Sequence, residues 1–86
     1  MKQFTYTIKD PLGIHARPAG LLAKAAKAYT DTTITVTKED KTVKASQLMK
    51  LMGLTVKQGN EVTVAAEGPQ EEEAIAAMQK FFEENL

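Results

Sequence analysis

Residues 13–20, Gly-Ile-His-Ala-Arg-Pro-Ala-Gly, contain the only histidine of this 86-residue chain, two positions before an arginine. An imidazole acts as a nucleophile near neutral pH when its ring is uncharged. A guanidinium group binds phosphate oxygens through paired, charge-assisted hydrogen bonds. His15 and Arg17 together therefore indicate chemistry on a phosphoryl group.

Pro18 predicts where these side chains lie. Proline costs about 3 kcal/mol inside a helix but is tolerated in the first turn, where backbone N–H groups have no partner within the helix. From Pro18 to Tyr29 the chain is rich in Ala and Leu, and Leu22, Ala26 and Tyr29 fall on one helical face. We therefore expect a helix there, with His15 within two residues of its N-terminus.

A helix N-terminus attracts anions through its unpaired N–H groups and the positive end of the helix dipole. The same potential disfavours a protonated imidazole, so we expect His15 to be an uncharged nucleophile that accepts a phosphoryl group. Arg17 would then stabilise the attached phosphate. Position alone leaves the alternatives open: such a histidine also serves as a helix cap or surface residue, and Arg17 as a solvated charge.

Alternating apolar and polar residues predict four strands. They cover Phe4, Tyr6 and Ile8 near the N-terminus, Thr32 to Thr37, Lys41 to Lys44, and Glu61 to Glu67. A short apolar run after Ser46 predicts a second helix that ends near Gly53. Pro69 is expected to start a third helix, with Glu71, Glu72 and Glu73 in its first turn and Ile75, Met78 and Phe82 on its inner face.

The predicted order is βαββαβα, which indicates an α+β fold. Strands that alternate keep one face exposed to water, so we expect an open-faced, two-layer sandwich: one antiparallel sheet with helices on one side. The chain is shorter than a usual single domain, so we expect one compact domain that covers residues 1–86.

Composition excludes several classes of function. The 11 basic and 11 acidic residues balance, so no global basic field would bind nucleic acid. No segment has the apolar length of a signal peptide or a membrane helix, and there is no cysteine. We expect a soluble, cytoplasmic monomer with no cofactor, no metal site and no membrane insertion.

The motif around His15 resembles that of the HPr family, the histidine-containing phosphocarriers of the bacterial sugar phosphotransferase system. The histidine, arginine and proline agree in spacing, and the stretches GLTVKQGNEVTV and AEGPQEEEA extend the likeness along the chain. The resemblance implies a four-stranded sheet of order 1-4-2-3 with three helices on one face. It also implies that His15 takes phosphate from phosphorylated enzyme I and passes it to the IIA domains of sugar permeases.

Ser46 has two interpretations. Its hydroxyl can cap the second helix. In low-GC Gram-positive members of the family, the matching serine is phosphorylated by an HPr kinase/phosphorylase, which weakens docking with enzyme I. Ala45 stands where the family commonly has a basic residue, and the stretch to Gly59 is one residue longer than in many members.

The resemblance also implies a docking surface beside the histidine. On a helical wheel Leu48, Met49 and Met52 share one side of the second helix, whereas Leu51 and Leu54 lie toward another. We expect one set to fill the core and the other to contact partners. The expected partner-binding residues are Gly20, Lys24, Lys27, Leu48, Met49 and Met52, although the lysines can also be a solvated stripe.

A self-sufficient enzyme is not expected, because the chain has no Walker loop, no second histidine and no acidic pair beside His15 in sequence. Partner proteins of a carrier would supply the missing catalytic groups. The competing functions are a regulatory module of the same fold that carries no phosphate, a small acylphosphatase, and a carrier in a nitrogen-linked phosphorelay.

Overall fold

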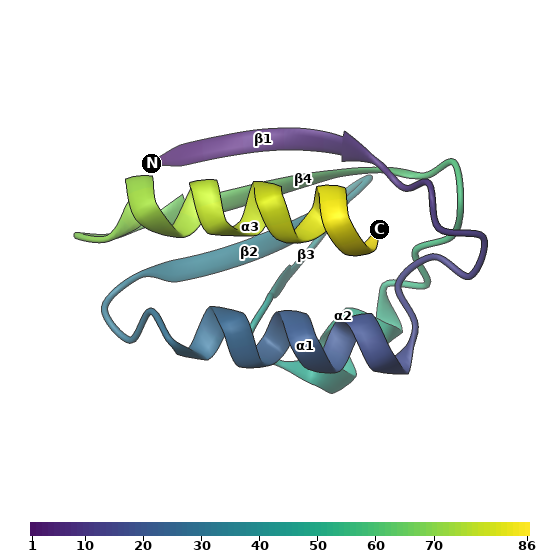
Figure 1. Cartoon of the computed structure of the whole chain (residues 1–86), viewed down its shortest axis with the longest axis horizontal. Coiled ribbons are helices and arrows are strands. Elements are labelled where there is room, and N and C mark those ends of the chain that lie inside the picture. The colour runs from purple at the N-terminus through teal and green to yellow at the C-terminus, as the bar shows by residue number, and fades with distance from the viewer.

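The computed structural model describes residues 1–86 and contains four strands and three helices in the order βαββαβα (Figure 1). The strands are β1 (Lys2–Thr7), β2 (Thr33–Lys38), β3 (Lys41–Lys44) and β4 (Glu61–Glu67). The helices are α1 (Ala16–Lys27), α2 (Leu48–Gly53) and α3 (Glu71–Asn85). The predicted element order is confirmed.

The four strands form one antiparallel sheet of order β1-β4-β2-β3. Val64 of β4 lies opposite Phe4 of β1 on one side and Val36 of β2 on the other, and Val36 in turn lies opposite Val43 of β3. The strand order implied by the family resemblance is therefore confirmed. Strand β1 pairs only with β4, so the complete sheet forms only when residues distant in the sequence meet.

Burial alternates along the two central strands. Ile34 and Val36 of β2 are buried, as are Val62, Val64 and Ala66 of β4, whereas the residues between them are half-buried. All three helices therefore pack on one face of the sheet, and the other face stays open. This arrangement confirms the expected two-layer sandwich.

Side chains from all three helices fill the space above the sheet. Phe82 of α3 is fully buried and meets Phe4 and Tyr6 of β1 edge-on, with ring centroids 5.8 and 5.6 Å apart. Leu22 of α1 and Leu51 of α2 are fully buried in the same core. Each such side chain stabilises the fold by about 1.5–3 kcal/mol through burial. Their packing holds α1 against both α2 and α3.

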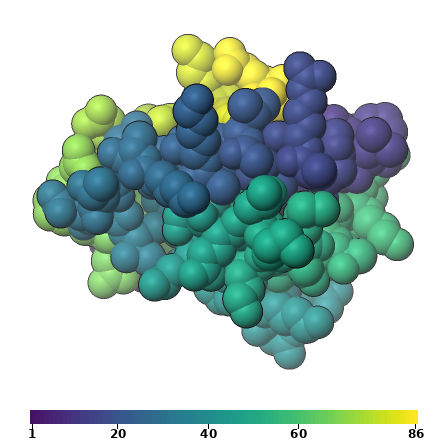
Figure 2. All heavy atoms as spheres, turned by 90° about the horizontal axis from the view of Figure 1, so that it is seen from below, coloured from purple at the N-terminus to yellow at the C-terminus, as the bar shows by residue number.

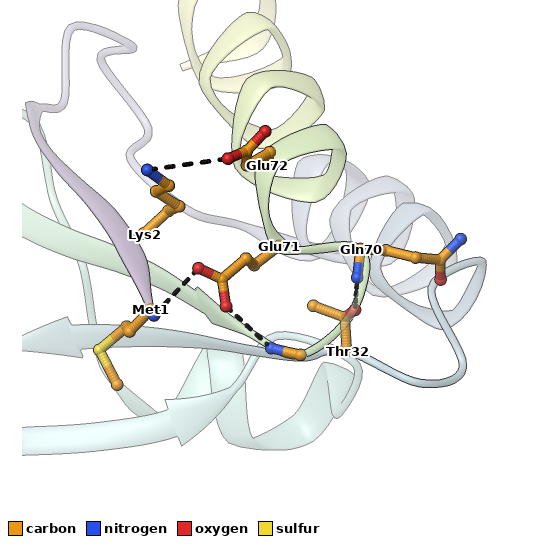
Figure 3. Close-up of polar contacts among 7 residues, drawn as sticks. Met1, Lys2, Thr32, Gln70, Glu71 and Glu72 are labelled. Carbon is orange, nitrogen blue, oxygen red and sulfur yellow. Dashed lines mark hydrogen bonds and ion pairs between the residues drawn. The ribbon is translucent and has the colours of Figure 1, made fainter.

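The start of α3 is held by groups from other parts of the chain (Figure 3). The backbone N–H of Gln70 donates to Oγ1 of Thr32 at 3.0 Å. Glu71 accepts from the Gly68 N–H at 3.3 Å and pairs with the amino group of Met1 at 3.0 Å. Through the hydrogen bond from that amino group, and then the one from Gly68, these contacts lower the pKa of the Glu71 carboxyl below its ordinary value of 4.5.

The prediction that Pro69 starts this helix is wrong by two residues. The N–H of Glu71 donates to the Gly68 carbonyl at 3.1 Å, which closes a turn around Pro69 and Gln70. The helical ladder then begins with the Ala74 N–H donating to the Gln70 carbonyl. Pro69 therefore sets the turn before the helix, while the expected acidic first turn is confirmed. None of the three helices has the length and apolar character needed to cross a membrane.

Candidate functional site: the start of helix α1

His15 is the N-cap residue of α1. Its backbone is extended, with φ −117° and ψ −175°, and its carbonyl accepts the N–H of Ala19 at 2.9 Å. Its side chain makes no capping hydrogen bond and is half-buried. The predicted location of His15 at the helix start is confirmed. The helix itself begins at Ala16, two residues before the predicted start, so Pro18 is its third residue.

The first turn of α1 leaves its hydrogen-bond donors free beside the imidazole. The N–H groups of Ala16 and Arg17 donate to no group of the chain, and Pro18 has no N–H. No acidic residue lies in this turn to occupy the positive end of the helix dipole. Backbone donors in this arrangement are suited to the oxygens of an anion.

The side chains of His15 and Arg17 line one surface hollow of about 310 Å³. The complete lining is Asp10, His15, Arg17, Pro18, Leu21, Glu84 and Asn85. The fold therefore brings together the two residues predicted to act on phosphate. It adds Glu84 and Asn85 from the end of α3, which no local pattern in the sequence could place there.

Arg17 is exposed and makes no ion pair or hydrogen bond. Its guanidinium group is therefore available to an anion beside the His15 ring. Two carboxylates, those of Asp10 and Glu84, share the hollow. Asp10 has a structural role already, because its Oδ1 accepts the N–H of Leu12 at 2.8 Å.

A close backbone contact fixes the loop before His15. Gly13 has φ +66°, and a Cβ atom there would lie 2.1 Å from the carbonyl oxygen of Val56. The next N–H, that of Ile14, donates to the same Val56 oxygen at 3.0 Å. Only glycine fits this approach, so the segment between α2 and β4, which contains Val56, sets the position of the histidine.

The same loop is tied to the other end of the chain. The Leu86 carbonyl oxygen accepts the N–H of Lys9 at 2.6 Å and that of Asp10 at 2.8 Å. These bonds bring the end of α3 to the hollow around His15. They explain why Glu84 and Asn85 line it.

Helix α2 divides its apolar residues between the core and the surface, as predicted. Leu51 and the C-cap residue Leu54 are buried, whereas Leu48, Met49 and Met52 are 38%, 78% and 40% exposed. Figure 2 shows α1, in blue, and α2, in teal, side by side on one face of the molecule.

Leu21 of α1, which the sequence analysis did not single out, is also exposed. It lines the His15 hollow and lies one turn along the helix from Arg17. We call the exposed set Leu21, Leu48, Met49 and Met52 the apolar patch. Of the other predicted docking residues, Gly20 is half-buried, and Lys24 and Lys27 are exposed on α1.

Basic and acidic residues are distributed unevenly over the elements of the fold. Residues 16–30 and 41–60, which contain α1, β3 and α2, carry seven of the eleven basic residues and none of the acidic ones. Helix α3, by contrast, carries Glu71, Glu72, Glu73, Glu83 and Glu84 against the single cation of Lys80. The neutral total therefore conceals an excess of basic residues on α1 and α2, the two helices that carry the apolar patch, and on β3.

The interpretation of Ser46 as the cap of α2 is wrong. The N-cap is Gln47, and no side chain caps the helix. Ser46 lies one residue earlier because the Gln47 N–H donates to the Lys44 carbonyl at 3.1 Å, which continues the turn leaving β3. The half-buried Ser46 instead lines a hollow of about 230 Å³ together with Lys27 and Lys44.

The comparisons with known proteins agree with this geometry. Residues 2–84 match the family model PTS-HPr, described as the PTS HPr component phosphorylation site. The phosphocarrier protein HPr of Mycoplasma genitalium is 38% identical over 99% of this chain and 97% of its own length. The one from Vibrio cholerae is 48% identical over 86% of this chain and 84% of its own.

A solved structure has the same fold. The crystal structure of HPr-C-His from Thermoanaerobacter tengcongensis superimposes with a TM-score of 0.90, at 44% identity, and the match covers 96% of this chain and 92% of that one. The family match spans the sheet, α1, α2, all but the last residue of α3, and the half-buried histidine at the start of α1. The chain therefore belongs to the HPr family of phosphocarriers of the phosphotransferase system.

Proposed function

We propose that His15 accepts a phosphoryl group from phosphorylated enzyme I and donates it to the IIA domains of sugar permeases. The observation that carries this proposal is the half-buried imidazole at the start of α1, with no hydrogen bond of its own and two free backbone N–H groups in the adjacent turn. The family match supports the same role.

The reaction would exchange one phosphorus–nitrogen bond for another. An unprotonated ring nitrogen of His15 attacks the phosphorus of the donor's phosphohistidine, and the bond from phosphorus to the donor nitrogen breaks. The electron pair of the broken bond returns to the donor ring. Transfer to a IIA domain repeats the exchange with His15 as the leaving group, so no oxidant, metal or cofactor is consumed.

The residues of the hollow would balance retention of the phosphate against its release. The guanidinium of Arg17 and the free N–H groups of Ala16 and Arg17 offer donors to the phosphate oxygens. Because the hollow is open to solvent, these interactions are weaker than in an enclosed site. A phosphate held there would remain available to an acceptor, as a carrier in the cytoplasm requires.

The test starts from the fact that the chain has a single histidine. We expect the protein, with phosphoenolpyruvate and enzyme I, to gain an acid-labile phosphate that His15→Ala does not take up. Addition of a IIA domain should then remove the phosphate. Arg17→Gln should still be phosphorylated, but with kcat/KM reduced about ten- to a hundred-fold, as expected for loss of a charged donor at a reacting phosphate.

The competing functions give other outcomes in the same experiment. A regulatory module that carries no phosphate would gain none, and an acylphosphatase would hydrolyse small acyl phosphates with no partner present. Uptake only from the donor of a nitrogen-linked relay would assign the chain to that pathway instead.

We also propose that Ser46 is a regulatory phosphorylation site for an HPr kinase/phosphorylase. Ser46 lies two residues before α2, the helix that carries three of the four residues of the apolar patch. A phosphoserine there adds nearly two negative charges to the basic side of the molecule and would weaken attraction to an acidic partner. Ser46→Asp should raise the KM of enzyme I for the carrier, whereas Ser46→Ala should leave it unchanged.

A further inference from the structure

The C-terminal end of α2 is held by a lysine from another element. Lys38, the last residue of β2, donates from Nζ to the carbonyl oxygen of Thr55 at 2.8 Å and to that of Leu54 at 3.4 Å. Both carbonyls follow the last residue of the helix, where carbonyl groups lack helical partners and the dipole is negative. An ammonium group in this position donates hydrogen bonds to these carbonyls and places a positive charge at the negative end of the dipole.

The same end of α2 is strained. Thr55 has φ +54°, in the left-handed region that a β-branched residue rarely adopts. The N–H groups of Leu54 and Thr55 donate to the carbonyls of Leu51 and Met52, each at 3.2 Å, which tightens the last turn. Without an outside contact, this turn would relax easily.

Helix α2 is also too short to be stable by itself. It has six residues, and isolated helices of fewer than about twelve are marginal in water. Leu51 and Leu54 fix it to the core from below, and Lys38 holds its end from the side. The exposed Leu48, Met49 and Met52 make no comparable contribution to holding the helix.

We propose that Lys38 is a positioning residue for partner docking: its ammonium group keeps α2 in the conformation that presents the apolar patch. A preformed patch binds more tightly, because partner binding does not first have to order it. This inference rests on the function proposed above, since it assumes that the patch contacts the phosphoryl donor.

The test compares Lys38→Met with Lys80→Met, which removes the same charge from the exposed surface of α3. With enzyme I as the phosphoryl donor and the carrier as the varied substrate, we expect Lys38→Met to raise KM about three- to ten-fold and to change kcat by less than about two-fold. Lys80→Met should leave both constants unchanged. The ratio of the KM of Lys38→Met to the KM of the original protein should be the same at high salt, because the effect arises from helix geometry and not from long-range attraction.

Hydrogen exchange provides a readout that needs no partner. In Lys38→Met the backbone N–H groups of Leu54 and Thr55 should exchange about ten-fold faster, while those of α1 and β4 keep their rates. Lys38→Arg, which retains a charged donor, should keep KM and exchange within about two-fold of the original protein.

The inference would be overturned by an unchanged exchange rate at the end of α2, by an unchanged KM for Lys38→Met, or by an equal loss in Lys38→Arg. Faster exchange throughout Lys38→Met would also overturn it, since the lysine would then support the whole fold. If the unmodified protein takes up no phosphate from any donor, the proposed function fails instead, and the exchange result still shows whether Lys38 holds α2.

Discussion

Gly13 sets the position of the histidine more directly than any side chain does. Its φ of +66° and its approach to the Val56 carbonyl leave no room for a Cβ atom. We expect Gly13→Ala to lower the free energy of unfolding by about 1–3 kcal/mol, the usual cost of a residue forced into this region, and to slow phosphoryl transfer by moving His15. Thermal unfolding and transfer kinetics measure the two effects.

Gly20→Ala is the matched control for stability. A Cβ atom at Gly20 would meet nothing within 4 Å, and the residue lies inside α1. Alanine should therefore raise the free energy of unfolding by about 0.5–1 kcal/mol. Equal effects of the two substitutions would show that the close approach at Gly13 is not what holds the loop.

Glu84 places an unpaired carboxylate beside the expected phosphate. It lines the His15 hollow, and neither of the two ion pairs of the structure involves it. Its charge should repel a phosphate on His15 and so favour release to an acceptor. When Glu84→Gln and the original protein compete for limiting phosphate at equilibrium, we expect the variant to hold about two- to five-fold more.

Glu83→Gln is the control for this competition. It removes the same charge from the same exposed helix end but does not line the hollow. Both acids lie at the negative end of the α3 dipole, so both substitutions should stabilise the helix similarly. An equal share of phosphate for Glu83→Gln and Glu84→Gln would contradict a specific role of Glu84.

At the scale of elements, the sequence predicts the bounds of β3 and β4, whereas β1 ends at Thr7, one residue before the predicted Ile8, and the helix ends are displaced. Alternation is local, so the strand at Glu61 to Glu67 is found at its predicted bounds. Helix α2 begins at Leu48, one residue after the predicted run starts, and α3 begins two residues after Pro69, because hydrogen-bonded turns hold the chain first. Those turns depend on contacts such as that between Gln70 and Thr32, which are distant in sequence.

The hollow at His15 shows the same limit. The spacing of His15, Arg17 and Pro18 predicts half of the site, because these residues share one helical turn. The contributions of Glu84 and Asn85 depend on α3 ending beside the loop at Asp10. Nothing in either segment alone indicates that they meet.

The start of α3 should make stability depend on pH. The pKa of Glu71 is lower in the folded state than its ordinary value of 4.5 in the unfolded chain. Its contribution to stability is therefore fully present above that value and is lost as the pH falls through the folded pKa. We expect Glu71→Gln to be less stable than the original protein at pH 7, with the difference shrinking below about pH 4.5 in urea unfolding.

Glu73→Gln separates these contacts from the dipole of the helix. Glu73 lies in the same first turn but is exposed and makes no ion pair. Loss of its charge removes only a favourable dipole interaction. If Glu71→Gln and Glu73→Gln gave identical pH profiles, the contacts from Met1 and Gly68 would not contribute to folding.

At the scale of the whole molecule, the separation of charge suggests how a neutral protein finds its partners. Seven basic residues and no acidic ones lie in residues 16–30 and 41–60, which include α1, β3 and α2, whereas α3 is acidic and brings Glu84 to the edge of the His15 hollow. An acidic partner would therefore be attracted to the correct side and repelled from the other. Such steering acts on the rate of association and is weakened by salt.

Phosphoryl transfer should accordingly depend on salt and on which lysine is changed. We expect kcat/KM with enzyme I to fall about five- to ten-fold between about 50 and 500 mM salt. Lys24→Glu and Lys27→Glu should each lower kcat/KM at low salt and much less at high salt. Lys80→Glu, on acidic α3, should leave it unchanged. A salt-independent rate would mean that the apolar patch and not charge selects the partner, and equal losses at all three lysines would mean that net charge, not its distribution, governs the rate.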